Sequence, residues 1–277
     1  MRTSTWKLLA LTTIAWIVPA MAQGPKLYIM DCGTIGEMDM KLYNLTKEEV
    51  KGPLELVNVC YLIVHARGTL LWDAGYIPDS AFPADGSPAK NGVFGATKKL
   101  TTQLAEIGYK PEQITYLGLS HYHSDHTGNA NLFAGSMWIV QESEYAAMFG
   151  GEQRGIQTRS SYEKLKDAKR ITLKNEDKDV FGDGTVVIKT APGHTPGHQM
   201  LFLKLAKFGP VLLAGDLYHY PEERTLDRVP TFDGDAAMTR VTRKKVDEFV
   251  KQTGAQMWIE HDKTTHDKLN KSPKFYE

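Results

Sequence analysis

Short apolar runs alternate with polar segments that contain glycine and proline, and this pattern predicts an α/β fold. Apolar, β-rich runs predict strands over Leu27–Cys32, Leu56–His65, Thr69–Asp73, Ile114–Leu119, Met137–Val140, Thr185–Thr190, Gln199–Leu205, Pro210–Ala214 and Gln256–Glu260. Apolar residues at helical spacing predict helices over Thr97–Gly108, Glu142–Phe149 and Asp235–Thr253. Two long segments, Gly33–Pro53 and Ile77–Gly95, are predicted to be irregular.

Two local features sharpen this outline. Ala66-Arg67-Gly68 separates two of the predicted strands, so we expect a β-hairpin there, with His65 exposed beside the turn. In the last helix we expect Asp235 to be the N-cap and Gly254 to follow the C-terminus. The apolar side of that helix is predicted to consist of Met238, Val241, Val246, Phe249 and Val250.

A dense polar run directly follows the predicted strand Ile114–Leu119. It reads Ser-His-Tyr-His-Ser-Asp-His-Thr-Gly-Asn and contains His121, His123, Asp125 and His126. These side chains cannot all face a core, because each buried polar group needs a partner. Imidazole and carboxylate groups are ligands that zinc and similar metals prefer. A single histidine here would be read as solvent-exposed, but the four together predict a metal site on a loop after a strand.

Three more residues of ligand type stand at the ends of predicted strands: His194, Asp216 and His261. A lone histidine at a strand end is more often structural, and a lone aspartate after glycine is usually a cap or part of a turn. Their shared position at carboxyl ends of strands strengthens the assignment of all three, because such ends meet at one edge of an α/β fold.

The first residues have the pattern of a secretory signal peptide. Arg2 and Lys7 precede an apolar run, Leu8–Val18, that is too short to span a bilayer. Pro19 and the small-x-small sequence Ala20-Met21-Ala22 follow, so we expect cleavage after Ala22 and a secreted or periplasmic protein. The alternative is an uncleaved N-terminal anchor. Residues 23–277 are long enough for one domain with a single substantial core.

Charge and cysteine content limit the possible partners. The formal net charge is +0 and no basic stripe is present, so we do not expect nucleic acid as a partner. No apolar segment after residue 22 is long enough to insert stably into a membrane. Cys32 and Cys60 lack a Cys-x-x-Cys neighbour; export would allow them to form a disulfide, and the alternative is two small buried apolar residues.

The order His121-x-His123-x-Asp125-His126, His194, Asp216, His261 resembles the metallo-β-lactamase superfamily. The resemblance covers nearly the whole chain after residue 22, including Asp73-Ala74-Gly75 and Gly193-His194-Thr195-Pro196-Gly197-His198. Within the superfamily, the pattern is most similar to the N-acyl homoserine lactonases, which are two-metal hydrolases. The resemblance implies an αββα sandwich of two mixed β-sheets flanked by helices, with the site at one edge.

The resemblance also implies how the ligands are shared between two divalent metal ions. One ion would be held by His121, His123 and His194, and the other by Asp125, His126 and His261, with Asp216 bridging both. Zinc is the expected metal, and iron, cobalt or manganese would also suit nitrogen and oxygen ligands. A hydroxide shared by the ions would attack the carbonyl carbon of the substrate, and Asp125 would pass a proton to the leaving alkoxide.

One position departs from the lactonase pattern. Several lactonases carry a tyrosine three residues after the bridging aspartate, where this chain has His219, with Tyr218 directly before it. We expect one of these two side chains to donate a hydrogen bond to the oxyanion, since neighbours on an extended segment face opposite ways. His219 is favoured because it occupies the position of the lactonase tyrosine.

The predicted function is therefore that of an exported hydrolase that opens a lactone or carboxylic ester, including an N-acyl homoserine lactone as in quorum quenching. One alternative is hydrolysis of β-lactams or thioesters; the β-lactamases of this superfamily lack the bridging aspartate, so Asp216 argues against β-lactams. RNA-processing relatives share the ligands, but export and the lack of a basic surface disfavour RNA. An alternative of another class is a non-catalytic periplasmic metal-binding protein with a coordinatively closed site.

The loops near the ligand edge are expected to rim the pocket: Gly33–Pro53, Gly75–Gly95 and Tyr218–Gly234. Their apolar and aromatic side chains are candidates for an acyl channel, although more than half are expected to pack in cores or loops instead. These candidates are Met38, Met40, Tyr76, Phe94, Phe149, Tyr218 and Phe232.

Overall fold

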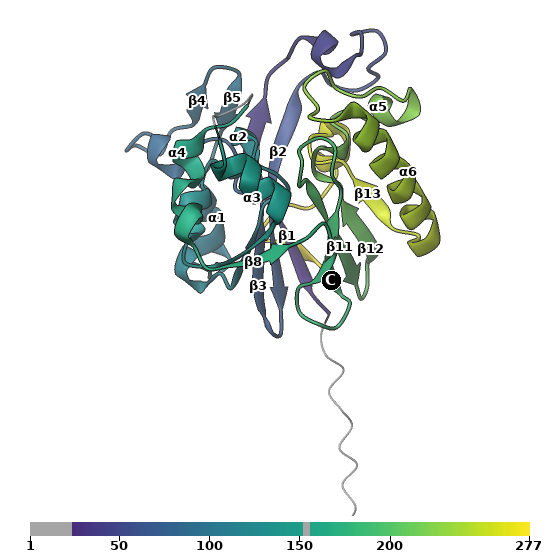
Figure 1. Cartoon of the computed structure of the whole chain (residues 1–277). Coiled ribbons are helices and arrows are strands. Elements are labelled where there is room, and N and C mark those ends of the chain that lie inside the picture. The colour runs from purple at the N-terminus through teal and green to yellow at the C-terminus, as the bar shows by residue number, and fades with distance from the viewer. Residues whose placement is uncertain (1–23, 152–155) are drawn as a thin grey trace, which may run out of the picture.

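The computed structural model describes residues 24–151 and 156–277, so the predicted signal peptide lies outside the described residues. Two β-sheets pack face to face, and helices cover the outer face of each (Figure 1). The predicted αββα arrangement of two mixed sheets is confirmed. None of the helices in these two ranges is long and apolar enough to cross a membrane.

The first sheet follows the order β4-β5-β1-β2-β3-β6-β7-β8, and β14 also pairs with β1. Antiparallel pairing joins β1 to β2 and β2 to β3, whereas β3, β6, β7 and β8 are parallel. The strands are β1 (Lys26–Ile35), β2 (Leu56–His65), β3 (Gly68–Trp72), β4 (Ala89–Asn91), β5 (Phe94–Ala96), β6 (Tyr116–Gly118), β7 (Met137–Gln141), β8 (Arg170–Leu173) and β14 (Phe275–Tyr276).

The second sheet follows the order β13-β12-β11-β10-β9. Its strands are antiparallel except for the pair β12–β13, which is parallel because the long helix α6 (Ala236–Thr253) connects the two. The strands are β9 (Lys178–Asp179), β10 (Val186–Thr190), β11 (Gln199–Leu205), β12 (Gly209–Leu213) and β13 (Gln256–Trp258).

The remaining helices are short and lie mostly against the first sheet or in loops. The α-helices are α1 (Leu100–Glu106), α2 (Ser124–Thr127), α3 (Glu142–Phe149), α4 (Arg159–Tyr162), α5 (Pro221–Thr225) and α7 (Lys263–His266). The 3₁₀ helices are η1 (Met40–Tyr43), η2 (Asp79–Ala81), η3 (Pro111–Gln113), η4 (Ala130–Phe133), η5 (Glu163–Asp167) and η6 (Gly215–Leu217).

Three apolar layers hold the sandwich together. The central layer fills the space between the sheets and includes Tyr61, Trp72 and Leu201. A second layer joins the first sheet to α1 and α3, and a third joins the second sheet to α6 through residues such as Leu212 and Val246. Burial of each large apolar side chain contributes about 1.5–3 kcal/mol, so the central layer fixes the relation between the two sheets.

The packing also places the four ligand-bearing segments at one edge of the sandwich. His121 to His126 follow β6 of the first sheet, and His194, Asp216 and His261 follow β10, β12 and β13 of the second. The parallel pair β12–β13 brings the residues after these two strands side by side, since parallel strands end at the same edge.

Several boundaries and exposures differ from the sequence prediction. β1 continues to Ile35 through a bulge at Asp31–Gly33, and α1 is shorter than the predicted helix. The segment predicted to be irregular contains most of the short hairpin β4–β5, whose three-residue strands are too short to show alternation. The prediction that His65 is exposed is wrong: its ring stacks on Phe181, and its Nε2 lies 2.8 Å from Asp183.

Helix α6 is capped as predicted, but the face that it turns toward the protein interior differs from the predicted one. Asp235 accepts from the Met238 backbone N–H, and Gly254 is left-handed with φ +67°. Met238 and Val241, however, are 40% and 48% exposed. The helix instead faces inward with Thr239 and Thr242, whose hydroxyls donate at 2.6 Å to Asp233 and to the Pro192 carbonyl.

A disulfide joins Cys32 in β1 to Cys60 in β2. The two strands are already paired in the ladder, so the bridge fixes the register of the bulged part of β1. Of the two alternatives left open by the sequence, the structure supports the disulfide.

We predict that protein produced under oxidising conditions carries no free thiol. Alkylation without reduction should label neither Cys32 nor Cys60, and reduction before alkylation should label both, as mass spectrometry would show. The double variant Cys32→Ala/Cys60→Ala should lose about 3–4 kcal/mol of unfolding free energy, the loop-entropy value for a separation of 28 residues. Two labelled thiols in the unreduced protein would contradict the bridge.

Candidate metal centre

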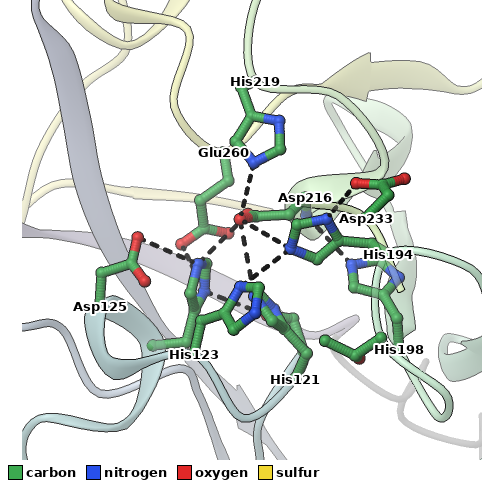
Figure 2. A network of polar contacts seen from close by, with 12 residues as sticks. His121, His123, Asp125, His194, His198, Asp216, His219, Asp233 and Glu260 are labelled. Atoms are coloured by element: carbon green, nitrogen blue, oxygen red, sulfur yellow. Dashed lines mark hydrogen bonds and ion pairs between the residues drawn. The ribbon is translucent and has the colours of Figure 1, made fainter. Parts of the chain in front are cut away.

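All seven predicted ligands converge at the edge of the sandwich where the two sheets meet. Figure 2 shows His121, His123, Asp125, His194 and Asp216 among them. His123 is the N-cap residue of α2, so the short helix carries Asp125 and His126 directly after it. Each of the seven residues is buried, with relative exposures from 0% to 8%. Side chains from the two sheets thus share one enclosed site.

The carboxylate of Asp216 lies at the centre of this group. Its Oδ2 lies 3.6 Å from Nε2 of His121 and 3.5 Å from Nε2 of His194. Its Oδ1 lies 3.2 Å from Nε2 of His126 and 3.1 Å from Nε2 of His261. The two oxygens of one carboxylate therefore face two different sets of imidazoles, which is the arrangement of a bridging ligand.

The ligand atoms form two groups that share Asp216. His121, His123 and His194 make up the first with Asp216, and Asp125, His126 and His261 make up the second; the atoms of each group lie within 4.8 Å of one another. In the first group, Nδ1 of His123 lies 3.0 Å from Nε2 of His194. This is the division of ligands that the family resemblance implies.

The site passes a test of fit for cations, because buried polar atoms at its centre lack partners. Nε2 of His121, Nε2 of His126 and Oδ1 of Asp216 have no hydrogen bond within the described ranges. Buried polar groups without partners destabilise a fold by about 1–3 kcal/mol each, and two divalent ions would satisfy all of them. The two groups therefore suit two metal ions.

The protonation of the first ligand group also favours metal binding. Burial, with repulsion from neighbouring imidazoles, holds the pKa of His121 and of His123 well below the usual range, so both rings are neutral. Burial alone would raise the pKa of Asp216, but the charges of His126 and His261 outweigh it and hold the pKa well below its usual range. Neutral imidazoles and an ionised carboxylate are the forms that bind metal. In the second group, burial alone would lower the pKa of His126, but the carboxylates of Asp216, Asp125 and Asp73 outweigh burial and raise that pKa, so a metal would displace a proton from this ring.

The outer nitrogens of the ligand histidines are held by fixed acceptors. Nδ1 of His194 lies 2.7 Å from Asp233, and Nδ1 of His261 donates to the Val57 carbonyl at 2.7 Å. Nδ1 of His126 lies 3.2 Å from Asp73. Each contact turns Nε2 of the ring toward Asp216, as partners behind a metal ligand commonly do.

The backbone around Asp216 is held by His198, the last residue of the Gly193–His198 segment. Its Nδ1 donates to the Ala191 carbonyl at 3.1 Å, and its Nε2 accepts from the Asp216 backbone N–H at 3.1 Å. Burial lowers the pKa of His198 to about 3, so the ring is neutral and can accept. Gly193 allows the turn before His194: its φ is +141°, and a Cβ there would collide with Thr239.

Glu144 in α3 joins the two loops of the first ligand group. Its carboxylate accepts from the Tyr122 backbone N–H at 2.8 Å, from the Gly197 backbone N–H at 2.7 Å and from the Thr195 hydroxyl at 2.9 Å. Burial raises its pKa to about 7 although these donors lower it. Glu144 therefore fixes Tyr122, which stands between His121 and His123, and Thr195, which follows His194.

The structure separates the two candidate residues that follow Asp216. Tyr218 points into the apolar layer under α6, where the Arg243 guanidinium lies 4.1 Å from its ring centre. This placement argues against the predicted catalytic role of Tyr218. His219 points into the site, with Nε2 3.1 Å from Asp216 and Nδ1 3.3 Å from Glu223 (Figure 2).

Sequence reasoning missed Asp233, Glu144 and His198 as parts of the site. His198 had a signal, because it belongs to the same glycine-rich segment as His194. Asp73 also had a signal in the sequence, since it begins the Asp73-Ala74-Gly75 turn. Glu144 and Asp233 had none: Glu144 looks like any acidic residue in the first turn of a helix, and Asp233 like any loop residue before a helix.

Two cavities reach the ligands, one at His123 and one at His261. One of about 500 Å³ contacts His123 and is lined by Tyr122, Ala146, Ala147, Ile156 and Phe232, among others. The other, of about 190 Å³, contacts His261 and is lined by Leu56, Tyr220 and Lys263, among others. A third cavity, of about 400 Å³, touches none of the seven ligands.

Of the predicted acyl-channel residues, Phe232 lines one of the two cavities that reach the metal-ligand residues. Met38 and Met40 pack in the cluster around Leu45, and Phe149 packs against Trp138. Tyr76 stacks on Phe94 and lines the third cavity, which none of the seven metal-ligand residues borders. The other predicted members of the channel are therefore packing residues, as expected for most of the set.

We predict that Asp233→Asn weakens metal binding by about 10- to 100-fold, the usual effect of losing a charged partner behind a ligand histidine. Titration with a competing chelator would measure the loss. Asp235→Asn is the matched control, because asparagine is also a good N-cap and Asp235 does not contact a ligand. Equal metal affinity in the two variants would contradict this role of Asp233.

Known proteins are similar to this chain in sequence and in fold. The chain is 27% identical over 264 residues to an N-acyl homoserine lactonase, AttM, of Azorhizobium caulinodans, with 91% of this chain and 98% of that protein covered. It is 34% identical over 224 residues to an N-acyl homoserine lactonase of a Bacillus species, with 76% of this chain and 82% of that protein covered.

A solved N-acyl homoserine lactone hydrolase, described with N-hexanoyl-L-homoserine bound at its catalytic metal centre, has a similar fold. The TM-score is 0.75 at 25% identity, and the match covers 91% of this chain and 99% of that chain. Residues 54–251 match the family described as the metallo-beta-lactamase superfamily. Together with the geometry of the ligands, these matches establish that the chain is a metal-dependent hydrolase that belongs to the metallo-β-lactamase superfamily.

Proposed function

We propose that this hydrolase opens the ring of N-acyl homoserine lactones, and that zinc occupies both metal positions. The observation that carries the proposal is the Asp216 carboxylate, whose two oxygens face the two separate groups of ligands. The superfamily's β-lactamases lack such a bridge. The relatives with matching sequence and fold are named as lactonases of this class.

The ligands fix where the chemistry takes place. When bound, two zinc ions would supply Lewis acidity toward the carbonyl oxygen and would lower the pKa of a nearby water toward neutrality. His121, His123 and His194 would hold one ion, and Asp125, His126 and His261 the other, with Asp216 between them. Two divalent ions held by five histidines and by the carboxylates of Asp125 and Asp216 would leave the centre cationic overall, which favours an anionic transition state.

Ring opening forms a bond between a water oxygen and the carbonyl carbon and breaks the bond from that carbon to the ring oxygen. The departing alkoxide needs a proton. Asp125 is suited to deliver it, because its side chain keeps 12% exposure whereas that of Asp216 keeps 3%, so Asp125 can exchange protons with solvent.

His219 is proposed to hold the bridging carboxylate in place. Burial opposes a charge on this ring, but the carboxylates of Glu223 and Asp216 outweigh it and raise the pKa of His219 to about 10. Its nitrogens lie 3.1 Å from Asp216 and 3.3 Å from Glu223. A direct hydrogen bond from His219 to substrate, as predicted from the sequence, fits these contacts less well, because both nitrogens already face carboxylates.

The larger cavity is proposed to receive the acyl chain. It reaches His123 and is lined by Phe232 and Ile156 together with the small residues Ala146, Ala147 and Gly150. Small side chains leave room for a flexible chain, and the aromatic ring supplies apolar contact. The narrower cavity at His261, of about 190 Å³, leaves less space for such a chain.

Export is a separate proposal. Its support is the basic and apolar pattern of residues 1–22 and the Cys32–Cys60 disulfide, which is typical of proteins in oxidising compartments. A secreted or periplasmic protein should begin at Gln23 when it is purified from that compartment, as N-terminal sequencing would show.

We predict that the zinc-loaded protein converts N-hexanoyl-L-homoserine lactone to the open acid, with a mass gain of one water and release of one proton. Removal of metal with 1,10-phenanthroline should abolish the reaction, and added Zn²⁺ should restore it. Aryl esters, thioesters and β-lactams tested in parallel should react more slowly. Faster turnover of a β-lactam, or activity that survives complete metal removal, would refute the proposal.

We predict about two metal equivalents per chain by elemental analysis, as expected for a two-metal hydrolase. Asp216→Ala should lose at least one equivalent and nearly all activity, because the bridge contacts both groups. Asp247→Ala is the control: this aspartate lies on the exposed face of α6, paired with Arg224. A wild-type stoichiometry that stays near one with excess metal would contradict the two-metal site.

A further inference from the structure

A tyrosine from the N-terminal half of the chain reaches the ligand cluster. Tyr43 is the last residue of η1, in the segment between β1 and β2. Asp39 caps this turn by accepting from the Lys41 backbone N–H at 3.0 Å, and Asn44 ends it in a left-handed conformation with φ +53°. The turn aims Tyr43 inward, where its exposure is 5%.

The segment that carries Tyr43 is fixed to the loop that follows Asp216. The Leu42 carbonyl accepts from the Thr231 backbone N–H at 2.7 Å and from its hydroxyl at 3.1 Å. The Asn44 side chain donates to the Val229 carbonyl at 2.6 Å. Tyr43 therefore sits between two points of attachment, which gives its ring a defined place in the site.

The Tyr43 ring packs beside His219 and contacts one residue from each of the two cavities that reach the ligands. Its centre lies 5.2 Å from that of His219, which contacts Asp216. It also packs edge-on against Phe232 of the larger cavity, at 5.6 Å, and against Tyr220 of the narrower one, at 5.1 Å. A substrate that bridges the cavities would pass this ring.

The hydroxyl of Tyr43 has no hydrogen-bond partner among the described residues. Its neighbour Tyr220 is different, because the Tyr220 hydroxyl donates to the Leu54 carbonyl at 2.7 Å. The residue as a whole is 95% buried, but the hydroxyl oxygen is not among the fully buried atoms without a partner, so it faces accessible space in which a ligand can accept its hydrogen bond. Burial, Tyr220 and the carboxylates of Asp125, Glu223 and Asp216 raise the pKa of Tyr43 well above its usual range, so the phenol keeps the proton that it would donate.

We propose that the Tyr43 hydroxyl donates a hydrogen bond to the oxyanion that forms when water adds to the substrate carbonyl. This inference rests on the proposed function, since it requires an ester or lactone carbonyl. Tyr43 would thus supply, from another part of the chain, the phenol that the lactonases place three residues after the bridging aspartate. His219 occupies that position here, and its nitrogens face Asp216 and Glu223.

The test compares Tyr43→Phe with Tyr218→Phe, which removes the same oxygen from a tyrosine in the layer under α6. For N-hexanoyl-L-homoserine lactone, Tyr43→Phe should lower kcat by about 10²-fold, the lower end for loss of one oxyanion donor, with KM little changed. Tyr218→Phe should keep wild-type kcat. The melting temperature and metal content of Tyr43→Phe should match the wild type, because the lost hydroxyl has no partner within the protein.

A second measurement does not depend on turnover. Hexylphosphonate carries tetrahedral oxyanions, and calorimetric titration should show weaker binding to Tyr43→Phe than to the wild type or Tyr218→Phe. Equal kcat, or equal phosphonate affinity, in Tyr43→Phe and the wild type would overturn the inference. If the wild type hydrolyses no lactone or ester, the proposed function fails, and the phosphonate titration still decides the role of Tyr43.

Discussion

The structure depends on one buried carboxylate. Asp216 is 3% exposed, and its charge is stable there only because five imidazole nitrogens surround it within 3.6 Å. They belong to residues that follow β6 of one sheet and β10, β12 and β13 of the other. The sandwich must therefore close before Asp216 has its partners, and the central apolar layer is what holds the two sheets in that relation.

A second set of contacts converts this cluster into a defined centre. Asp233, Asp73 and the Val57 carbonyl hold the outer nitrogens of three ligand histidines, while Glu144 ties together the loops that carry the others. Ligands whose orientations are fixed before binding lose little freedom when a metal or a substrate arrives. The same reasoning applies to Tyr43, whose segment is attached to the loop 218–234 at Val229 and Thr231.

The metal ligands were predictable from the sequence, and the groups that position them mostly were not. His121 to His126 lie so close along the chain that local sequence reveals them, and the other ligands stand at strand ends. Asp233, Glu144 and Tyr43 act through contacts between distant segments, which no local pattern records. The short strands β4 and β5 were missed for a related reason, because pairing of β5 with β1 and of β4 with β5, rather than alternation, defines them. His65 was misjudged because its partner, Asp183, lies far along the chain.

The division of ligands between the sheets has a consequence for folding. Neither sheet alone carries a full set, so an ion with its whole ligand set binds only the closed sandwich and not the unfolded chain. By mass action, each ion at one hundred times its dissociation constant would add about 2.7 kcal/mol to the free energy of unfolding. The metals would then link the two sheets, and the stability of the fold would increase with the free metal concentration of its compartment.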